Sequence, residues 1–286
     1  MKRLLIVLPW LLVASLIACT PSENAEATVK NAVPGEVQTM TFSNGDRELH
    51  GLLYKPDGPG PFPAVLYNHG SAPGSTNNQA FDAIAPIFLE RGWVFFAPYR
   101  RGQGLSADAG PYIMDEINAA RRRGGISDAA ETMTRLLSTD HLDDQLAALA
   151  WLRAQPLVRG DAIAVMGNSF GGIETVLGAE RGNYCAAVDA AGGAESWDEA
   201  PELRHLLTRT VEKVTPPIFF FQAENDFNLE ASRTLFSARQ RAGLPADLKI
   251  YSAYGHSRRD GHSFPYRGVS VWRDDVMQFL ERHCLK

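Results

Sequence analysis

The chain has 286 residues, of which 45% are hydrophobic and 21% charged, with 25 glycines and 17 prolines. This composition is typical of a globular protein and excludes a collagen-like, coiled-coil or wholly disordered chain. The formal net charge is −5, and no segment combines a basic face with interleaved aromatic residues, so no nucleic-acid partner is expected.

The N-terminus carries the pattern of an export signal. Lys2 and Arg3 precede an apolar stretch, residues 4–18, which is shorter than the roughly 20 residues needed to span a bilayer. The Leu-Ile-Ala-Cys sequence that ends at Cys19 resembles the lipobox of bacterial lipoproteins, in which the cysteine is acylated and becomes the mature N-terminus. The sequence therefore predicts a signal peptide over residues 1–18 and lipidation at Cys19.

A tether and a location follow from this signal. Residues 19–36 are small, polar and interrupted by proline, which favours a flexible tether. The folded domain is expected over residues 37–286, a length that one α/β domain can fill. The protein is expected in a bacterial cell envelope, held by its lipid, and either facing the periplasm or on the outer membrane.

The domain is expected to open with an antiparallel hairpin. Two strands, 37–43 and 49–55, flank Asn44-Gly45, a turn signal in which both central residues take positive φ. Short apolar runs then alternate with amphipathic helices, a pattern typical of an α/β fold with a mostly parallel central sheet and helices on both faces. The remaining strands are predicted at residues 64–68, 93–97, 163–166, 186–191, 218–221 and 248–251. Helices are predicted at residues 79–91, 140–154, 229–242 and 271–283, and directly after residue 170.

One helix and two longer segments carry further expectations. In the helix at 140–154 the periodicity assigns one face to the sheet and the opposite face to solvent. The sheet-facing residues are expected to be Leu142, Leu146, Leu149 and Ala150, and the solvent-facing ones Asp143, Asp144 and Arg153. The segment 106–138 is longer than a usual strand-to-helix connection, so a partly helical excursion bordering a pocket is expected there. The stretch 197–214 is the other candidate for pocket lining.

The chemistry is concentrated in Gly-Asn-Ser-Phe-Gly at residues 167–171. G-x-S-x-G alone is a weak signal, but here it directly follows the apolar run 163–166 and precedes a helical stretch. Strand, sharp turn and helix form the setting of a nucleophile elbow, whose glycines leave room for a strained serine with an exposed Oγ. We predict Ser169 as the nucleophile and the N–H of Phe170 as one oxyanion donor.

A serine alcohol needs a base to take its proton and an acid to orient that base. An acid follows the buried run 218–221, where Asp226 is the predicted residue and Glu224 the alternative. Either residue places a carboxylate just past the end of a predicted strand, in the chain order serine, acid, histidine.

The base is one of two histidines. His256 lies close to the end of the last predicted strand, whereas His262 lies at the far end of a polar loop, 257–261. That loop gives His262 room to fold back over Ser169. The base must lie within hydrogen-bond distance of both the nucleophile and the acid.

Two loops after predicted strands complete the site. Asn-His-Gly-Ser at residues 68–71 allows a close backbone approach at its glycine, so the N–H of Ser71 is the second predicted oxyanion donor. His69 is expected to stabilise this loop. Arg100 and Arg101 follow the next strand, where one of them would either bind a substrate carboxylate or form a structural ion pair.

Together these motifs resemble the α/β-hydrolase superfamily, specifically its dienelactone hydrolase-like branch, from about residue 37 to the C-terminus. The resemblance rests on Asn68-His69-Gly70, Arg101-Gly102-Gln103-Gly104, Gly167-Asn168-Ser169-Phe170-Gly171-Gly172, Asp226 and Gly261-His262-Ser263-Phe264. The family pattern of Gly-His, a small residue and Phe favours His262 over His256. Dienelactone hydrolases proper use a cysteine nucleophile, so Ser169 implies a serine esterase or acyl hydrolase. The Arg-Gly-x-Gly stretch and the elbow are also similar to the catalytic domain of prolyl oligopeptidase-like peptidases.

The expected function is hydrolysis of a small-molecule ester or related acyl bond through a Ser-His-Asp triad and an acyl-enzyme. The alternatives are a prolyl oligopeptidase-like peptidase or amidase and a non-catalytic envelope binding lipoprotein. No metal or organic cofactor is expected, because the sequence lacks zinc-ligand, Walker A and dinucleotide-binding motifs. The sequence leaves open the substrate, the oligomeric state and whether Cys185 and Cys284 pair.

Overall fold

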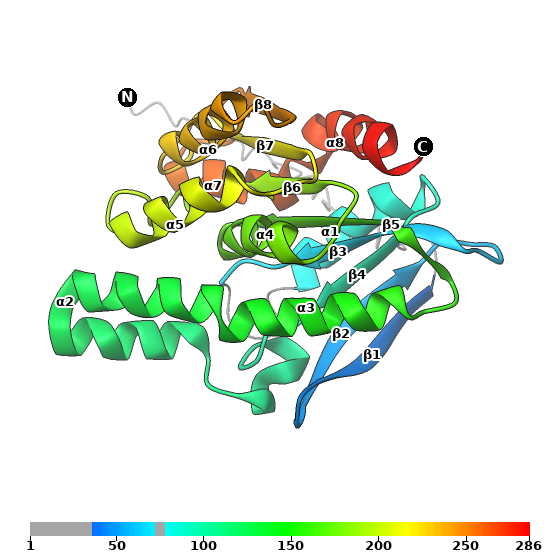
Figure 1. Ribbon diagram of the computed structural model, residues 1–286, viewed down its shortest axis with the longest axis horizontal. Coiled ribbons are helices and arrows are strands. Elements are labelled where there is room, and N and C mark those ends of the chain that lie inside the picture. The colour runs from blue at the N-terminus through cyan, green and yellow to red at the C-terminus, as the bar shows by residue number, and fades with distance from the viewer. Residues whose placement is uncertain (1–35, 72–77) are drawn as a thin grey trace, which may run out of the picture. The chain divides into compact units, whose positions relative to one another are not determined.

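The computed structural model describes residues 36–71 and 78–286, and these build an eight-stranded sheet (Figure 1). The strands are β1 (Glu36–Asn44), β2 (Arg47–Lys55), β3 (Phe62–Asn68), β4 (Val94–Pro98), β5 (Val158–Asn168), β6 (Ala187–Ala190), β7 (Ile218–Ala223) and β8 (Ala246–Tyr251). Their order across the sheet is β1-β2-β4-β3-β5-β6-β7-β8. The pairs β1–β2 and β2–β4 are antiparallel and the other neighbours are parallel. The predicted mostly parallel sheet with an antiparallel N-terminal hairpin is confirmed.

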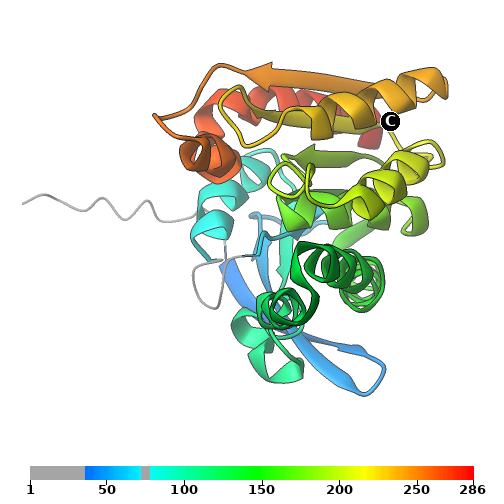
Figure 2. The same cartoon turned by 90° about the vertical axis from the view of Figure 1, so that its left-hand side faces the viewer.

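Helices cover both faces of this sheet. They are α1 (Asn78–Leu89), α2 (Ile113–Ser138), α3 (Asp140–Arg153), α4 (Phe170–Arg181), α5 (Pro201–Val211), α6 (Glu230–Arg241), α7 (Arg258–Arg267) and α8 (Val269–Cys284), with a 3₁₀ helix, η2 (Gly104–Ala109), before α2. One face carries α1, α7 and α8, and the other carries α2 to α6 (Figures 1 and 2). In β3, Leu66 packs into one hydrophobic core while Val65 and Tyr67 pack into the other, because successive strand residues point to opposite faces.

The hairpin turn is Gly45-Asp46, one residue later than predicted. Asn44 pairs with Arg47, which leaves two residues in the turn, and of these only Gly45 has a positive φ, at 62°. The turn therefore needs left-handed backbone at its first central position only, and glycine adopts it without steric cost.

The face that α3 turns to the core is the predicted one in its three leucines, Leu142, Leu146 and Leu149, and differs at two other positions. Leu142 and Leu149 are buried as expected, but Ala150 is exposed and Asp144 is 2% exposed. The Asp144 carboxylate accepts two hydrogen bonds from the Arg101 guanidinium, at 2.8 and 2.6 Å. The predicted solvent exposure of Asp144 is wrong, because a paired and hydrogen-bonded charge can stay inside a protein. Arg101 is thereby a partner in a structural ion pair.

Two helices occupy segments for which the sequence predicts none. These are α5 and α7, and α7 replaces most of the predicted polar loop 257–261. At its start, the Ser257 hydroxyl accepts the Asp260 N–H at 3.1 Å while the Asp260 carboxylate accepts the Ser257 N–H at 3.0 Å. This reciprocal capping begins the helix. His262 therefore lies within a helix, so its position is more rigid than a loop would make it.

A disulfide joins Cys185, just before β6, to Cys284 at the end of α8, with Cα atoms 5.1 Å apart. The bond ties the C-terminal helix to the edge of the sheet where β6 begins. Ser169 lies at the opposite edge, where β5 ends.

The predicted N-terminal features lie outside the described residues. These are the signal peptide over residues 1–18, the lipidation site Cys19 and the tether up to residue 35. In the described part of the chain, no helix is both long enough and apolar enough to cross a membrane.

Candidate active site

Ser169 lies in a tight turn between β5 and α4. Its backbone has φ 56° and ψ −120°, a left-handed conformation that costs a non-glycine residue about 1 to 3 kcal/mol. A Cβ at Gly171 would lie 1.9 Å from the Asn68 carbonyl oxygen, so the turn can approach the end of β3 this closely only with glycine there. The strained turn places the Ser169 side chain at the carboxyl edge of the parallel strands, where sites in α/β proteins form.

Three of the predicted side chains meet at this edge. His262 Nε2 lies 3.0 Å from Ser169 Oγ, and His262 Nδ1 lies 2.8 Å from Asp226 Oδ1. The buried Asp226 carboxylate also accepts the Phe227 N–H at 2.6 Å and the Gln222 side-chain amide at 3.2 Å. With Nδ1–H directed at Asp226, the lone pair of Nε2 faces the serine, which is the tautomer that can accept the hydroxyl proton.

The two alternatives from the sequence lie elsewhere. Glu224 is exposed, although it is only two residues before the buried Asp226. His256 is also exposed, and its backbone N–H donates to Asp260 at 3.0 Å. The structure thus brings Asp226 and His262 to Ser169 and leaves Glu224 and His256 outside.

The surroundings of His262 set its charge. Burial lowers the pKa of the imidazole. The hydrogen bond that Nδ1–H donates to the Asp226 carboxylate and the negative charge of that carboxylate raise the pKa by more, and the Glu195 carboxylate adds to the rise. The net pKa lies above the usual 6.5. Only the neutral imidazole can accept the proton of Ser169, so the fraction of protein with a competent base decreases as the pH falls through this pKa.

The loop at residues 68–71 lies against the nucleophile turn. A Cβ at Gly70 would be 3.6 Å from Ser169 Cβ. Phe170 is the first residue of α4, where backbone N–H groups have no partner within the helix. The predicted oxyanion donors, the N–H groups of Phe170 and Ser71, therefore belong to two segments that meet beside Ser169. The Tyr112 hydroxyl donates to the Ser71 carbonyl at 2.6 Å and fixes the end of that loop.

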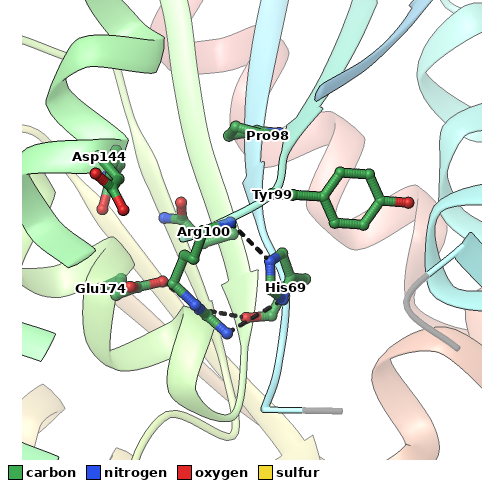
Figure 3. Close-up of a pocket in the computed structure, with 8 residues that line it drawn as sticks. His69, Pro98, Tyr99, Arg100, Asp144 and Glu174 are labelled. Atoms are coloured by element: carbon green, nitrogen blue, oxygen red, sulfur yellow. Dashed lines mark hydrogen bonds and ion pairs between the residues drawn. The ribbon is translucent and has the colours of Figure 1, made fainter. Parts of the chain in front are cut away.

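A buried charge pair holds this loop from behind. The Arg100 guanidinium donates to the carbonyls of His69 at 2.7 Å and Gly70 at 2.6 Å, and pairs with Glu174 of α4 at 2.5 Å. In Figure 3 the guanidinium lies between Glu174 and His69. At 5% exposure, Arg100 has its donors committed to the loop, so of the two roles considered for it the structural one holds. Burial lowers the pKa of His69 well below its usual value, with the charge of Arg100 adding to the effect, so its ring is neutral.

A cleft of about 610 Å³ opens over Ser169. The predicted excursion contributes Tyr112 and Met114 to its wall. The predicted lining stretch 197–214 does not line this cleft; the loop after β6 instead contributes Glu195, two positions before that stretch.

Sequence reasoning missed the charged residues of this cleft. Besides Glu195 they are Arg259 and Arg267 of α7. A usable signal existed, because the Ser-x-x-Asp pattern from Ser257 to Asp260 begins a helix that places Arg259 one turn before the histidine.

Two curated proteins that are named peptidases are similar in sequence to this chain. The uncharacterized peptidase YtmA of Bacillus subtilis (strain 168) is 24% identical over 246 residues, which cover 75% of this chain and 83% of the relative. Dipeptidyl-peptidase 5 of Porphyromonas gingivalis is 23% identical over 256 residues, which cover 77% of this chain and 34% of the relative. This chain thus spans about a third of that dipeptidyl-peptidase.

Solved structures share the fold. The acylaminoacyl peptidase of Pyrococcus horikoshii matches with a TM-score of 0.63 and 17% identity, over 87% of this chain and 42% of that one. An esterase of Pyrococcus furiosus matches with a TM-score of 0.64 and 15% identity, over 87% of this chain and 92% of that one. The model of the dienelactone hydrolase family matches residues 49–281, which is most of the chain. The chain has an α/β-hydrolase fold and belongs to the dienelactone hydrolase family.

Proposed function

We propose that this protein is a serine hydrolase that cleaves an ester or related acyl bond through an acyl-enzyme at Ser169. The observation that carries the proposal is the hydrogen-bonded series from Asp226 through His262 to Ser169 at the floor of an open cleft. Membership of a hydrolase family and the strained serine turn support it.

The geometry supports the following reaction. His262 Nε2 takes the hydroxyl proton while Ser169 Oγ attacks the carbonyl carbon. The carbonyl oxygen becomes negatively charged and accepts hydrogen bonds from the N–H groups of Phe170 and Ser71. One such donor contributes about 3 to 4 kcal/mol to transition-state stabilisation in comparable sites. The imidazolium then gives its proton to the leaving group as the bond breaks. Water repeats the sequence on the acyl-enzyme and releases the acid.

A peptidase is the second candidate. Two relatives that align with about three quarters of this chain are named peptidases. The same triad cleaves amides, so the two activities differ in the barrier for amine departure and in substrate positioning. An amide kcat/KM comparable with that of the matched ester would favour the peptidase.

Labelling with a fluorophosphonate tests the nucleophile. In the full-length protein, Ser169→Ala is expected to abolish labelling, because the probe reacts only with a serine that has an activating base. The matched control is Ser43→Ala at an exposed position of β1, which should label like the wild type. A folded wild type that is not labelled would overturn the hydrolase and favour a binding lipoprotein.

We also propose that the domain is anchored in a bacterial envelope by a lipid on Cys19. The N-terminal pattern supports this, and the Cys185–Cys284 disulfide suits an oxidising compartment. In a bacterial host, Cys19→Ser is expected to move the protein from the detergent phase to the aqueous phase in a cloud-point partition. Equal partition of both forms would contradict the anchor.

A further inference from the structure

The tip of a helical hairpin carries three consecutive arginines. The helix α2 breaks at Gly124 and Gly125, of which Gly125 has a left-handed backbone with φ 78°. Glycine adopts this conformation without steric cost, so the chain can reverse its direction there. Figures 1 and 2 show the two arms of α2 side by side, and in Figure 1 their joint projects past the sheet. Arg121, Arg122 and Arg123 directly precede this joint.

The three guanidiniums are not used in the described part of the chain. The buried side of the hairpin ends at Ala120 on the first arm and begins again at Ala130 on the second, and residues 121–128 between them are all exposed. Within residues 36–71 and 78–286, no carboxylate lies at ion-pair distance from the three arginines, and no acceptor takes their hydrogen bonds. Asp128 is the one acidic residue among residues 121–130, so the tip has an excess of positive charge.

The tip also exposes an apolar side chain. Ile126 follows the two glycines and is 47% exposed. The C-terminal end of a helical arm favours basic side chains, which is consistent with the arginines but does not explain an isoleucine beside them. Basic residues next to exposed apolar ones are typical of segments that lie at a lipid surface. There the charges meet anionic headgroups, and the apolar side chain enters the boundary of the hydrocarbon. An acidic polypeptide would satisfy the charges alone.

The charge of the whole chain favours contact through the tip. The formal net charge is −5, so three arginines in a row are a local reversal of sign. An anionic surface therefore repels the protein as a whole and attracts this tip. The lipid proposed above for Cys19 would keep the domain at a bilayer, where the high effective concentration populates even a weak contact.

We propose that the tip of α2, residues 121–126, docks on the anionic phospholipid surface of the membrane that anchors the protein. The guanidiniums bind headgroup phosphates through paired N–H donors, while Ile126 enters the interface beneath them. The inference goes beyond the proposed hydrolysis and uses the proposed anchor only to bring the bilayer near. Tyr112 and Met114, at the other end of the first arm, line the cleft over Ser169. A docked tip would therefore also fix the direction in which this cleft faces.

The test follows the environment of the tip on vesicles that carry the full-length lipoprotein. Cys185 and Cys284 are joined and the proposed lipid blocks Cys19, so the thiol of Ile126→Cys can be labelled selectively with nitrobenzoxadiazole, an environment-sensitive fluorophore. On phosphatidylcholine vesicles with about 30% phosphatidylglycerol, we expect the emission to shift to shorter wavelength relative to phosphatidylcholine alone. Raising NaCl to about 0.5 M should abolish the shift, because salt screens the charges.

Two variants separate charge from position. In the labelled protein, Arg121→Gln/Arg122→Gln/Arg123→Gln is expected to lose the shift, and these exposed substitutions should leave the fold intact. Val271→Cys is the matched control for the label, because Val271 is an exposed apolar residue of α8, on the other face of the sheet from α2. A label at that position should emit alike on both kinds of vesicle.

The outcomes separate the tip from the anchor and from other partners. Equal emission of the label at position 126 on both vesicles would overturn the docking. A shift on both vesicles that survives the glutamine substitutions would show an apolar contact alone and overturn the anionic surface. A shift produced by soluble polyglutamate but not by phosphatidylglycerol would place an acidic polypeptide at the tip instead. Flotation with the neutral vesicles reports the lipid anchor, whereas the emission reports the tip, so failure of one is distinguishable from failure of the other.

Discussion

Asp226→Asn is expected to reduce kcat for 4-nitrophenyl acetate by about 10⁴-fold. Asp226 Oδ1 lies 2.8 Å from His262 Nδ1 and holds the proton on that nitrogen, so that Nε2 is free to accept the proton of Ser169. An asparagine can direct its own N–H groups at Nδ1 and stabilise the opposite tautomer, in which Nε2 is a donor. The substitution is nearly isosteric, so the loss is one of proton position and charge.

The pH profile of the residual activity provides a second readout. Asp226 raises the pKa of His262, whereas burial lowers it and remains in the variant. The acidic limb of kcat/KM is therefore expected above pH 6.5 in the wild type and at lower pH in Asp226→Asn. Glu224→Gln is the matched control, because this exposed carboxylate lies two residues away and should change neither rate nor profile. A variant that keeps a tenth or more of the wild-type kcat would show that Asp226 does not orient the base.

The parts of the fold that follow from local pattern were predictable. The runs 64–68 and 218–221 lie within β3 and β7, because a parallel strand covered on both faces is apolar at most of its positions. The serine turn was equally predictable, since the strand, the glycines and the helix are contiguous. Because this turn follows the end of a parallel strand, it also predicts that the site lies at the carboxyl edge of the sheet, where loops from separate strands converge.

Features that depend on distant partners were not predictable. The burial of Asp144 requires Arg101, 43 residues earlier, and the structural role of Arg100 requires Glu174, 74 residues later. An interpretation from helical periodicity assigns every charged residue to the solvent-facing side, so it cannot predict a buried ion pair between distant residues. The helix α7 was missed for a local reason, because Gly261 and Pro265 lower its helix propensity while its capping residues compensate.

The loss of the Cys185–Cys284 disulfide is expected to lower the free energy of unfolding by about 4 kcal/mol. The two cysteines are 99 residues apart, and closing a loop of this length removes a large part of the conformational entropy of the unfolded chain. The comparison is between wild type and Cys185→Ser/Cys284→Ser in urea denaturation. Because the disulfide and Ser169 lie at opposite edges of the sheet, the folded double variant should keep the wild-type kcat.

A reductant separates the cross-link from the packing of the sulfur atoms. Dithiothreitol should destabilise the wild type by nearly the same amount as the double substitution, and it should leave the double variant unchanged, because only the wild type has a bond to reduce. Destabilisation of both proteins by the reductant would mean that it acts elsewhere. A wild type with the disulfide formed but less than about 1 kcal/mol more stable than its reduced form would show that the unfolded chain is already compact between the two cysteines, so that the bond constrains little. A stabilisation of the expected size would mean that the domain reaches its full stability only where cysteines oxidise, which is the compartment that the N-terminal signal predicts.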